Sequence, residues 1–353
     1  MRHSLITVLL VVYTISVVAQ NDSINTFKIQ GYGELYYSYD FSNPQNGEKP
    51  NFIYNHKRHD EVNINLTFLK ASYNKDYLRA NAAIMFGDYS KYNLSSEPSW
   101  AQLIYEANVG FKISKKQKLW LDVGVMPSHI GFESAMSSDC WTLTRSILAE
   151  NSPYFETGIK LSYTNKSERF NTSLLVLNGW QRIYTPNSIN SPSFGLQLNY
   201  KPNDKFTLNY SNFIGADKVN DIKYWRLYHN LYAIFEASTN LGVIVGIDFG
   251  SDKFNTANYS VWYSPIFILR YRINEKYKWA IRGEYFNDKK ENLIKTNTQN
   301  GFQTFGISSN FDIHIKDNLV WRIEGKEYYS KDKIFNNNRD NFTLTTSLAI
   351  KFN

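Results

Sequence analysis

The chain lacks the residues and segments on which several protein classes depend. Its 353 residues include one cysteine, so no intrachain disulfide can hold the fold. No run of 18 or more apolar residues follows the first twenty residues, which excludes a bundle of membrane-spanning helices. The common motifs of zinc proteases, dithiol redox sites, P-loop proteins and serine hydrolases are missing. The net charge of +7 is scattered rather than clustered, so nucleic-acid binding is not indicated.

The first nineteen residues have the pattern of a secretory signal peptide. A short basic start at Arg2 is followed by a mostly apolar run from Leu5 to Val18, which is too short to span a membrane comfortably. Val17 and Ala19 are aliphatic or small residues ahead of a cleavage point after Ala19. We therefore expect residues 1–19 to be removed on export and residues 20–353 to form the mature domain.

The mature chain shows a period of two from end to end. In the last segment Phe342, Leu344 and Leu348 fall on one face, whereas Thr343 and Thr345 fall on the other. Such alternation is typical of strands with one apolar face. Sixteen segments have this pattern: 27–39, 61–73, 77–88, 104–113, 118–126, 155–163, 170–178, 194–200, 206–214, 226–235, 241–249, 261–272, 279–286, 302–313, 319–328 and 341–352.

The connections between these segments alternate in length. Short ones follow the even-numbered segments, as at 74–76 and 164–169, and long ones follow the odd-numbered segments, as at 40–60 and 127–154. Outer-membrane barrels have short periplasmic turns and long external loops. We therefore predict an all-β fold, a transmembrane antiparallel up-and-down barrel of about 16 strands. An even strand number places both termini on the periplasmic side.

Charged residues follow the same alternation and take the face opposite the apolar one. A Lys or Arg facing lipid near the membrane midplane would cost roughly 2–4 kcal/mol, so these charges are expected to face the lumen. An excess of inward basic residues would favour anions. The residues expected to set the lumen charge are Arg79, Lys112, Arg270, Arg272, Arg282, Arg322, Glu106 and Glu284.

Aromatic residues are abundant, with Trp 8, Tyr 26 and Phe 23. Outward-phase pairs such as Tyr200 and Phe206, or Tyr271 and Trp279, flank short turns. Amphipathic rings at this depth form the interfacial girdle of a barrel, although strand propensity alone also favours them.

The longest connection, 127–154, is too apolar to extend freely into water. A barrel of sixteen strands leaves an aqueous channel, and this loop is expected to fold into it, with a short helix within 142–150. The alternative is an external cap or an oligomer contact. Folded inward, the loop would place four charged residues at the pore constriction: Glu133, Asp139, Arg145 and Glu150.

Three stretches carry a resemblance to a known family. Met126–Ser134, Leu143–Ile147 and Val176–Gln181 resemble the beta-barrel porin-2 (OmpL-like) family. The resemblance implies a Gram-negative outer-membrane porin, with trimers common among barrels of this size, and supplies no catalytic residue. The acidic loop motif Pro-Glu-Phe-Gly-Gly-Asp of general diffusion porins is absent, and the terminal aromatic residue common in outer-membrane proteins is here the penultimate Phe352.

Weaker signals for other chemistry remain. His56 and His59, beside acidic residues, allow a metal site, but a solvated polar loop is the simpler interpretation. Ser128 and His129 suggest a hydrolase only by adjacency, and Cys140 is expected to be a packed or free thiol. We therefore expect no catalytic residue, no metal and no cofactor.

The sequence as a whole predicts an outer-membrane porin for passive diffusion of small hydrophilic solutes. Its expected partners are outer-membrane lipid or lipopolysaccharide, those solutes and two further copies in a homotrimer. Two other functions stay open. One is an occluded receptor barrel without an open pore, and the other is a secreted soluble β-rich protein that binds carbohydrate.

Overall fold

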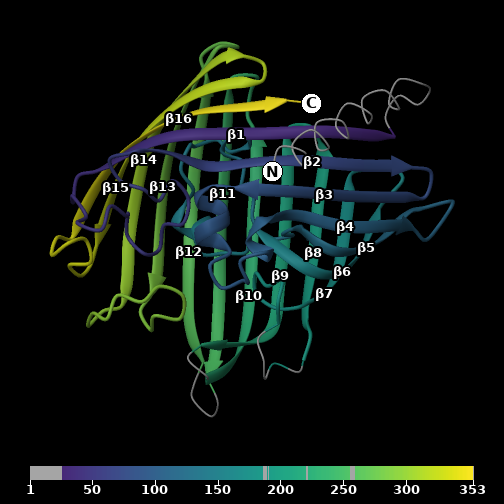
Figure 1. Cartoon of the computed structure of the whole chain (residues 1–353), viewed down its shortest axis with the longest axis horizontal. Coiled ribbons are helices and arrows are strands. Elements are labelled where there is room, and N and C mark those ends of the chain that lie inside the picture. The colour runs from purple at the N-terminus through teal and green to yellow at the C-terminus, as the bar shows by residue number, and fades with distance from the viewer. Residues whose placement is uncertain (1–25, 186–188, 190, 220–221, 255–258, 353) are drawn as a thin grey trace, which may run out of the picture.

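The computed structural model describes residues 26–352 except 186–188, 190, 220–221 and 255–258, so the expected signal peptide at 1–19 lies outside the described residues. The described chain forms a closed antiparallel barrel of sixteen strands, in which each strand pairs with its sequence neighbours and β1 pairs with β16 (Figure 1). The predicted fold class and strand number are therefore confirmed.

The strands correspond one for one to the alternating segments. Their bounds are β1 Phe27–Asp40, β2 Val62–Lys75, β3 Leu78–Phe86, β4 Ile104–Lys112, β5 Lys118–Pro127, β6 Phe155–Thr164, β7 Phe170–Leu177, β8 Ser193–Asn203, β9 Phe206–Val219, β10 Ile222–Glu236, β11 Leu241–Phe254, β12 Ser260–Arg272, β13 Tyr277–Asp288, β14 Phe302–Lys316, β15 Leu319–Ser330 and β16 Asp340–Phe352. Short helical turns occupy the long connections: η1 Tyr89–Asn93, η2 Ala101–Leu103, η3 Ser137–Asp139 and α2 Ile147–Glu150. Among the described residues, none of the helices has the length and apolar character needed to cross a membrane.

Strand β9 runs farther than its alternation predicts, to Val219 rather than residue 214. The added residues include Gly215, Ala216 and Asp217, which are too small or too polar to continue an apolar outer face. Hydrogen bonding between β9 and β10 nevertheless continues through them, because a backbone ladder needs no particular side chain.

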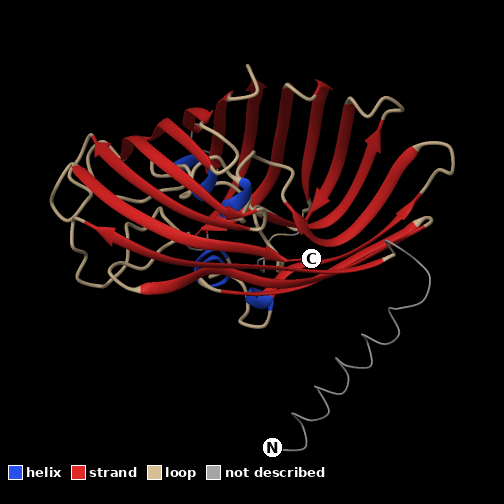
Figure 2. Cartoon of the chain, turned by 90° about the horizontal axis from the view of Figure 1, so that it is seen from above, coloured by secondary structure: helices blue, strands red, loops and turns tan. Residues whose placement is uncertain are grey.

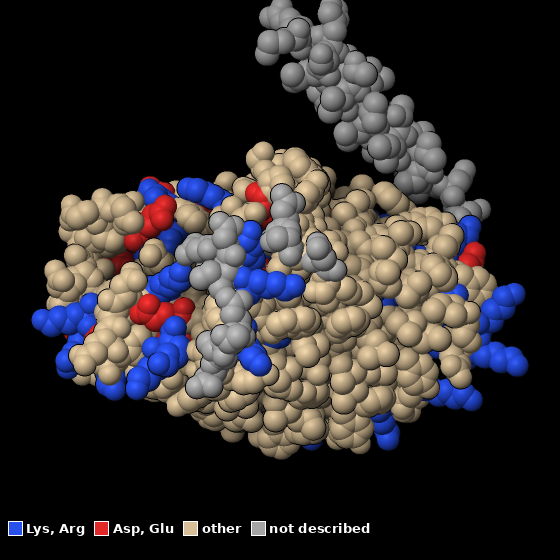
Figure 3. Space-filling view, turned by 90° about the horizontal axis from the view of Figure 1, so that it is seen from below, with Lys and Arg blue, Asp and Glu red and all other residues tan. Residues whose placement is uncertain are grey.

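The wall has an apolar outer face and a polar inner face, as the alternation requires. On β16, Leu344 and Leu348 are 43% and 44% exposed, whereas the inward Thr345 is fully buried. A broad area of the outer surface carries no charged residue (Figure 3). An outer surface of this kind suits a hydrocarbon environment.

Aromatic side chains stand on the outer face at the short-turn end of the strands. Tyr271 lies directly across from Trp279, and Phe170 lies across from Tyr200. The rings of Tyr200, Tyr271 and Trp279 are exposed. Their position matches that of an interfacial girdle.

The space inside the barrel is largely occupied by two long connections, 41–61 and 128–154, and Figure 2 shows loops and short helical segments within the ring of strands. The main apolar cluster joins Phe52 and Ile53 of the first connection with Ile130 and Ile147 of the third. These residues pack on inward rings such as Trp262. The core of this protein therefore lies in the lumen, between loops and wall.

Candidate functional site

The connection 128–154 is attached to one part of the barrel wall. The backbone N–H of Leu143 donates to Asn310 at 3.1 Å and that of Thr144 to Glu324 at 2.5 Å. In return, Arg322 donates to the carbonyls of Ser137 at 2.5 Å and Cys140 at 3.1 Å. Since the wall residues belong to β14 and β15, this loop lies inside the barrel and against that side.

Buried ion pairs support this attachment. Arg282 lies 2.9 Å from Glu324 and 3.5 Å from both Glu284 and the loop residue Glu133. Lys326 lies 2.7 Å from Glu284. Such charges are stable away from water only when paired and hydrogen-bonded. We call this surface the clamp wall; it consists of the inward residues Arg282, Glu284, Asp312, Arg322, Glu324 and Lys326.

Other residues expected to set the lumen charge are also paired. Arg79 forms a two-point ion pair with Asp122, with Nε–O at 2.6 Å. Glu106 accepts from Lys70 at 2.5 Å. Arg270 lies 2.7 Å from a carboxylate of Glu236 and stacks on a loop tryptophan, Trp141, at 4.0 Å. Lys112 and Arg272 also face inward but form no ion pair within the described part of the chain.

Two wall glycines make room for loop side chains. A Cβ on Gly195 would lie 2.8 Å from the ring of His129, and one on Gly242 would lie 2.6 Å from the ring of Trp141. Each ring therefore occupies a space that exists only because the wall residue is glycine. We call these two spaces, at Gly195 and Gly242, the sockets.

His129, whose ring lies in the socket at Gly195, forms a polar contact through each of its ring nitrogens. Nδ1 lies 2.7 Å from Glu156, and Nε2 lies 2.8 Å from the carbonyl of Asn212. Burial alone would lower the pKa of His129, but the Glu156 carboxylate outweighs it and raises the pKa. Ser128 instead accepts from the N–H of Ile130 at 3.1 Å. The arrangement lacks the nucleophile–base contact of a hydrolase.

The four charges expected at a constriction each have partners of their own. Arg145 is buried and donates to loop carbonyls, including that of Leu143 at 2.8 Å. Glu133 accepts from Ser146 and pairs with Arg282, while Asp139 pairs with Lys351 at the edge of the lumen. Burial raises the pKa of both Glu133 and Glu150. Their observed contacts are structural, although Glu133 and Glu150 each line a cavity.

The sequence analysis missed that the first long connection also folds inward. Glu150 accepts from the backbone N–H groups of Tyr54 at 2.9 Å and Asn55 at 3.2 Å, so it joins the two loops. Phe52 packs on Phe302 and Tyr328. The apolar run Phe52-Ile53-Tyr54 was the available signal, since the same criterion pointed to connection 127–154.

The histidines of the first connection have structural partners. His56 Nε2 lies 3.0 Å from Glu34, and Nδ1 of His59 accepts from the N–H of Asp40 at 2.9 Å. Within the described residues no group of three or more His, Cys, Asp or Glu side chains could hold a metal ion. Cys140 is packed, its sulfur accepting from the N–H of Ser134 at 3.2 Å, and burial raises its pKa.

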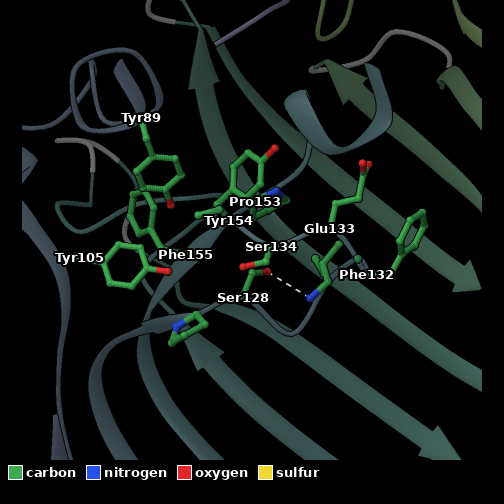
Figure 4. A pocket seen from close by; sticks show the side chains of 13 residues that line it. Tyr89, Tyr105, Ser128, Phe132, Glu133, Ser134, Pro153, Tyr154 and Phe155 are labelled. Carbon is green, nitrogen blue, oxygen red and sulfur yellow. Dashed lines mark hydrogen bonds between the residues drawn. The ribbon is translucent and has the colours of Figure 1, made fainter. Parts of the chain in front are cut away.

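Among the cavities of the described residues, three are lined in part by the connection 128–154. The outer cavity, about 200 Å³, is lined by Tyr92, Glu150 and Trp180 among others. The middle cavity, about 230 Å³, lies between the aromatic wall and the segment 130–135 (Figure 4). The inner cavity, about 300 Å³, shares Tyr105 and other lining residues with the middle one. We call the aromatic surface formed by Phe68, Tyr89, Tyr105, Tyr154 and Phe155 the passage wall.

Solved structures of outer-membrane channels have the same fold. The anion-selective porin from Comamonas acidovorans matches with a TM-score of 0.64 at 8% identity, over 93% of this chain and 99% of that chain. The outer membrane channel DcaP of Acinetobacter baumannii matches with a TM-score of 0.60 at 10% identity, over 92% and 97%. Salmonella typhi OmpF in complex with daunomycin matches with a TM-score of 0.58 at 10% identity, over 92% and 97%.

At such low identity these structures are similar in fold alone. None of the curated proteins compared with the chain matches it. The model of the family described as "Putative beta-barrel porin-2, OmpL-like" matches residues 26–352, which is the whole barrel from before β1 to the end of β16. The chain therefore belongs to this porin family.

Proposed function

We propose that the protein is an outer-membrane porin through which small hydrophilic solutes diffuse along the passage wall. The observation that carries this proposal is the series of cavities left beside the inward loops of a closed barrel. The middle and inner cavities share Tyr105, Pro127 and Ser134, so they adjoin. Membership of a porin family supports a channel rather than an enzyme.

The unpaired lumen charges favour anions. Lys112, Lys160, Arg272 and Lys278 face inward near the short-turn end, and none forms an ion pair in the part of the chain that is described. Arg272 lies directly across from Lys278, an arrangement of like charges that weakens a sheet. The Arg272–Lys278 pair therefore does not stabilise the fold. Attraction of anionic solutes to the short-turn end of the barrel would explain its presence.

The location and assembly follow from the same interpretation. Cleavage after Ala19 would release the barrel to the outer membrane, where lipid and lipopolysaccharide would surround its apolar face. Strands β3 to β7 have 8–10 residues, fewer than the other strands, so the barrel wall has a smaller height here. Exposed apolar side chains there, including Ile84 and Val109, suit contact with other copies in a homotrimer.

A second candidate is the occluded receptor barrel. The observation in its favour is the burial of two long loops in the lumen, joined by Glu150. In that case the cavities would be closed compartments rather than parts of one path.

Single-channel recording in a planar bilayer separates these functions. We expect discrete conductance steps and, in a KCl gradient, a reversal potential that indicates anion preference. Heat-modifiable folding without conductance would support the receptor barrel. Cation preference would overturn the role given to the four unpaired cations while leaving the porin in place.

A further inference from the structure

The middle and inner cavities are joined by a continuous row of aromatic rings. Phe68 and Tyr105 stack face to face, with centroids 4.4 Å apart and planes inclined by 8°. Tyr89 meets Tyr105 edge-on at 6.2 Å and Tyr154 at 5.6 Å. Tyr89, Tyr105 and Tyr154 line the middle cavity, whereas Phe68 and Tyr105 line the inner one. A solute moving between the cavities passes along these ring faces and edges.

Free hydroxyl groups lie among the rings. The hydroxyls of Tyr89 and Tyr105 have no hydrogen-bond partner among the described residues, although Tyr89 is only 2% exposed. Burial raises the pKa of Tyr89, so its phenol remains a protonated donor. Ser128 and Ser134 face the rings from the other side (Figure 4); each accepts one backbone N–H and keeps its own proton to donate. The cavity thus combines apolar faces with unused donors.

The charges around this space are neutralised. One of the residues that line the middle cavity is charged. This residue, Glu133, forms an ion pair with Arg282. In the inner cavity Lys70 pairs with Glu106, and Lys351 pairs with an aspartate of the loop. The anion-attracting cations lie elsewhere, so this space does not select for charge.

The size of the middle cavity restricts the occupant. Pockets for drug-sized ligands measure roughly 300–1,000 Å³, and this cavity has about 230 Å³. It therefore accommodates one small ring at a time.

We propose that the middle cavity binds a neutral ring-shaped polyol, a hexose in its pyranose form, as it passes through the barrel. The flat C–H face of the sugar ring would lie on the aromatic row, and the sugar hydroxyls would accept hydrogen bonds from the free phenol and serine groups. The proposal rests on the porin function and adds a solute class to it. An open-chain hexitol has comparable hydroxyl groups but no flat face, so the site should distinguish the two.

The test is block of the single-channel KCl current by D-glucose and by D-sorbitol. Glucose, but not sorbitol, should reduce the current in a saturable way. Replacing Tyr105→Leu removes the ring shared by both cavities and should weaken glucose block roughly two- to tenfold, the range expected for one aromatic contact. Tyr89→Phe removes a single hydroxyl, keeps the packing and should also weaken the block. Tyr329→Leu, on the exposed outer face, is the matched control and should leave it unchanged.

The outcomes separate the two proposals. If the wild-type barrel carries no KCl current, the porin function itself fails. If KCl passes but glucose gives no block, or sorbitol blocks equally, the sugar site is wrong. Block that is unaffected by both Tyr105→Leu and Tyr89→Phe would also overturn it.

Discussion

The clamp wall and the passage wall lie on opposite sides of one lumen and use their residues differently. On the clamp wall, Arg282, Arg322 and Lys326 are almost fully buried and bind loop carbonyls or carboxylates. On the passage wall, rings such as Tyr89 and Tyr105 leave cavities beside the same loop. Inward charge therefore stabilises the loop on one side, whereas uncharged aromatic surface leaves space on the other.

This difference affects what the number of inward charged residues says about ion selectivity. Counting inward Arg and Lys residues suggests a strongly basic pore, yet most of those residues are paired with carboxylates of the wall or of the loop. Selectivity then depends on the few cations without partners, near the short-turn end. The following predictions test the contacts that hold the loops and so sharpen this comparison.

The largest effect is expected from Arg282→Met on the clamp wall. The change leaves Glu324 buried without its counter-charge and leaves Glu284 with Lys326 alone, and breaking a buried pair costs about 3–5 kcal/mol in comparable cases. The unfolding temperature should fall and the single-channel conductance should rise as the loop loosens. Arg272→Met, which removes an unpaired cation and relieves its repulsion with Lys278, should not lower the unfolding temperature. Equal stability of the two variants would contradict the clamp.

A smaller effect is expected when a socket is filled. Gly195→Ala places a methyl group 2.8 Å from the His129 ring and should destabilise the barrel by about 1–3 kcal/mol. Gly283→Ala is the control, because nothing lies within 4 Å of its added carbon. Thermal unfolding of the two variants measures the difference, and identical curves would show that the socket does not hold the loop.

Glu150→Gln tests the contact between the two loops. The amide keeps an acceptor but loses the charge that strengthens the bonds from Tyr54 and Asn55, so a loss of about 1 kcal/mol is expected. Protease cleavage within 41–61 should become faster while the barrel remains folded. Unchanged cleavage would mean that the first loop is held by its apolar packing alone.

The smallest effect concerns pH. Burial lowers the pKa of Lys49 from 10.5 to about 8, although nearby carboxylates partly oppose the shift. Because protonation is disfavoured in the folded state, this residue contributes its full stability above the ordinary pKa, and that stability is lost as the pH falls through about 8. Its positive charge disappears as the pH rises through the same value. Thermal unfolding followed as a function of pH should show this loss of stability, and Lys49→Met should remove the step.

The sequence predicted the barrel well because alternation is a local property. Each strand shows its two faces within ten residues or so, and each connection shows its length directly. The inward parity of Arg282 or Glu284 could be read in the same way. Whether such a residue contacts water or a loop could not be predicted from the sequence. That depends on the path of residues more than a hundred positions away, as in the hydrogen bond from Thr144 to Glu324.

The roles predicted for individual site residues show this limit. Arg145 carries the right charge in the right loop, but it binds carbonyls of its own loop. The aromatic cavity was missed because Phe68, Tyr89, Tyr105 and Tyr154 come from different strands and connections, and only closure of the barrel brings them together. Apolar content in long connections was the usable signal, and it applies to 41–61 as well as to 127–154.

The most direct test of the central claim is thiol modification during single-channel recording. In a Cys140→Ser background, Tyr105→Cys places a thiol on the passage wall and Ser308→Cys places one on β14 beside the clamp wall. A membrane-impermeant thiol reagent should reduce the unit conductance of Tyr105→Cys and leave that of Ser308→Cys unchanged. A reduction at Ser308→Cys but not at Tyr105→Cys would place the path on the other side of the loop and contradict the account.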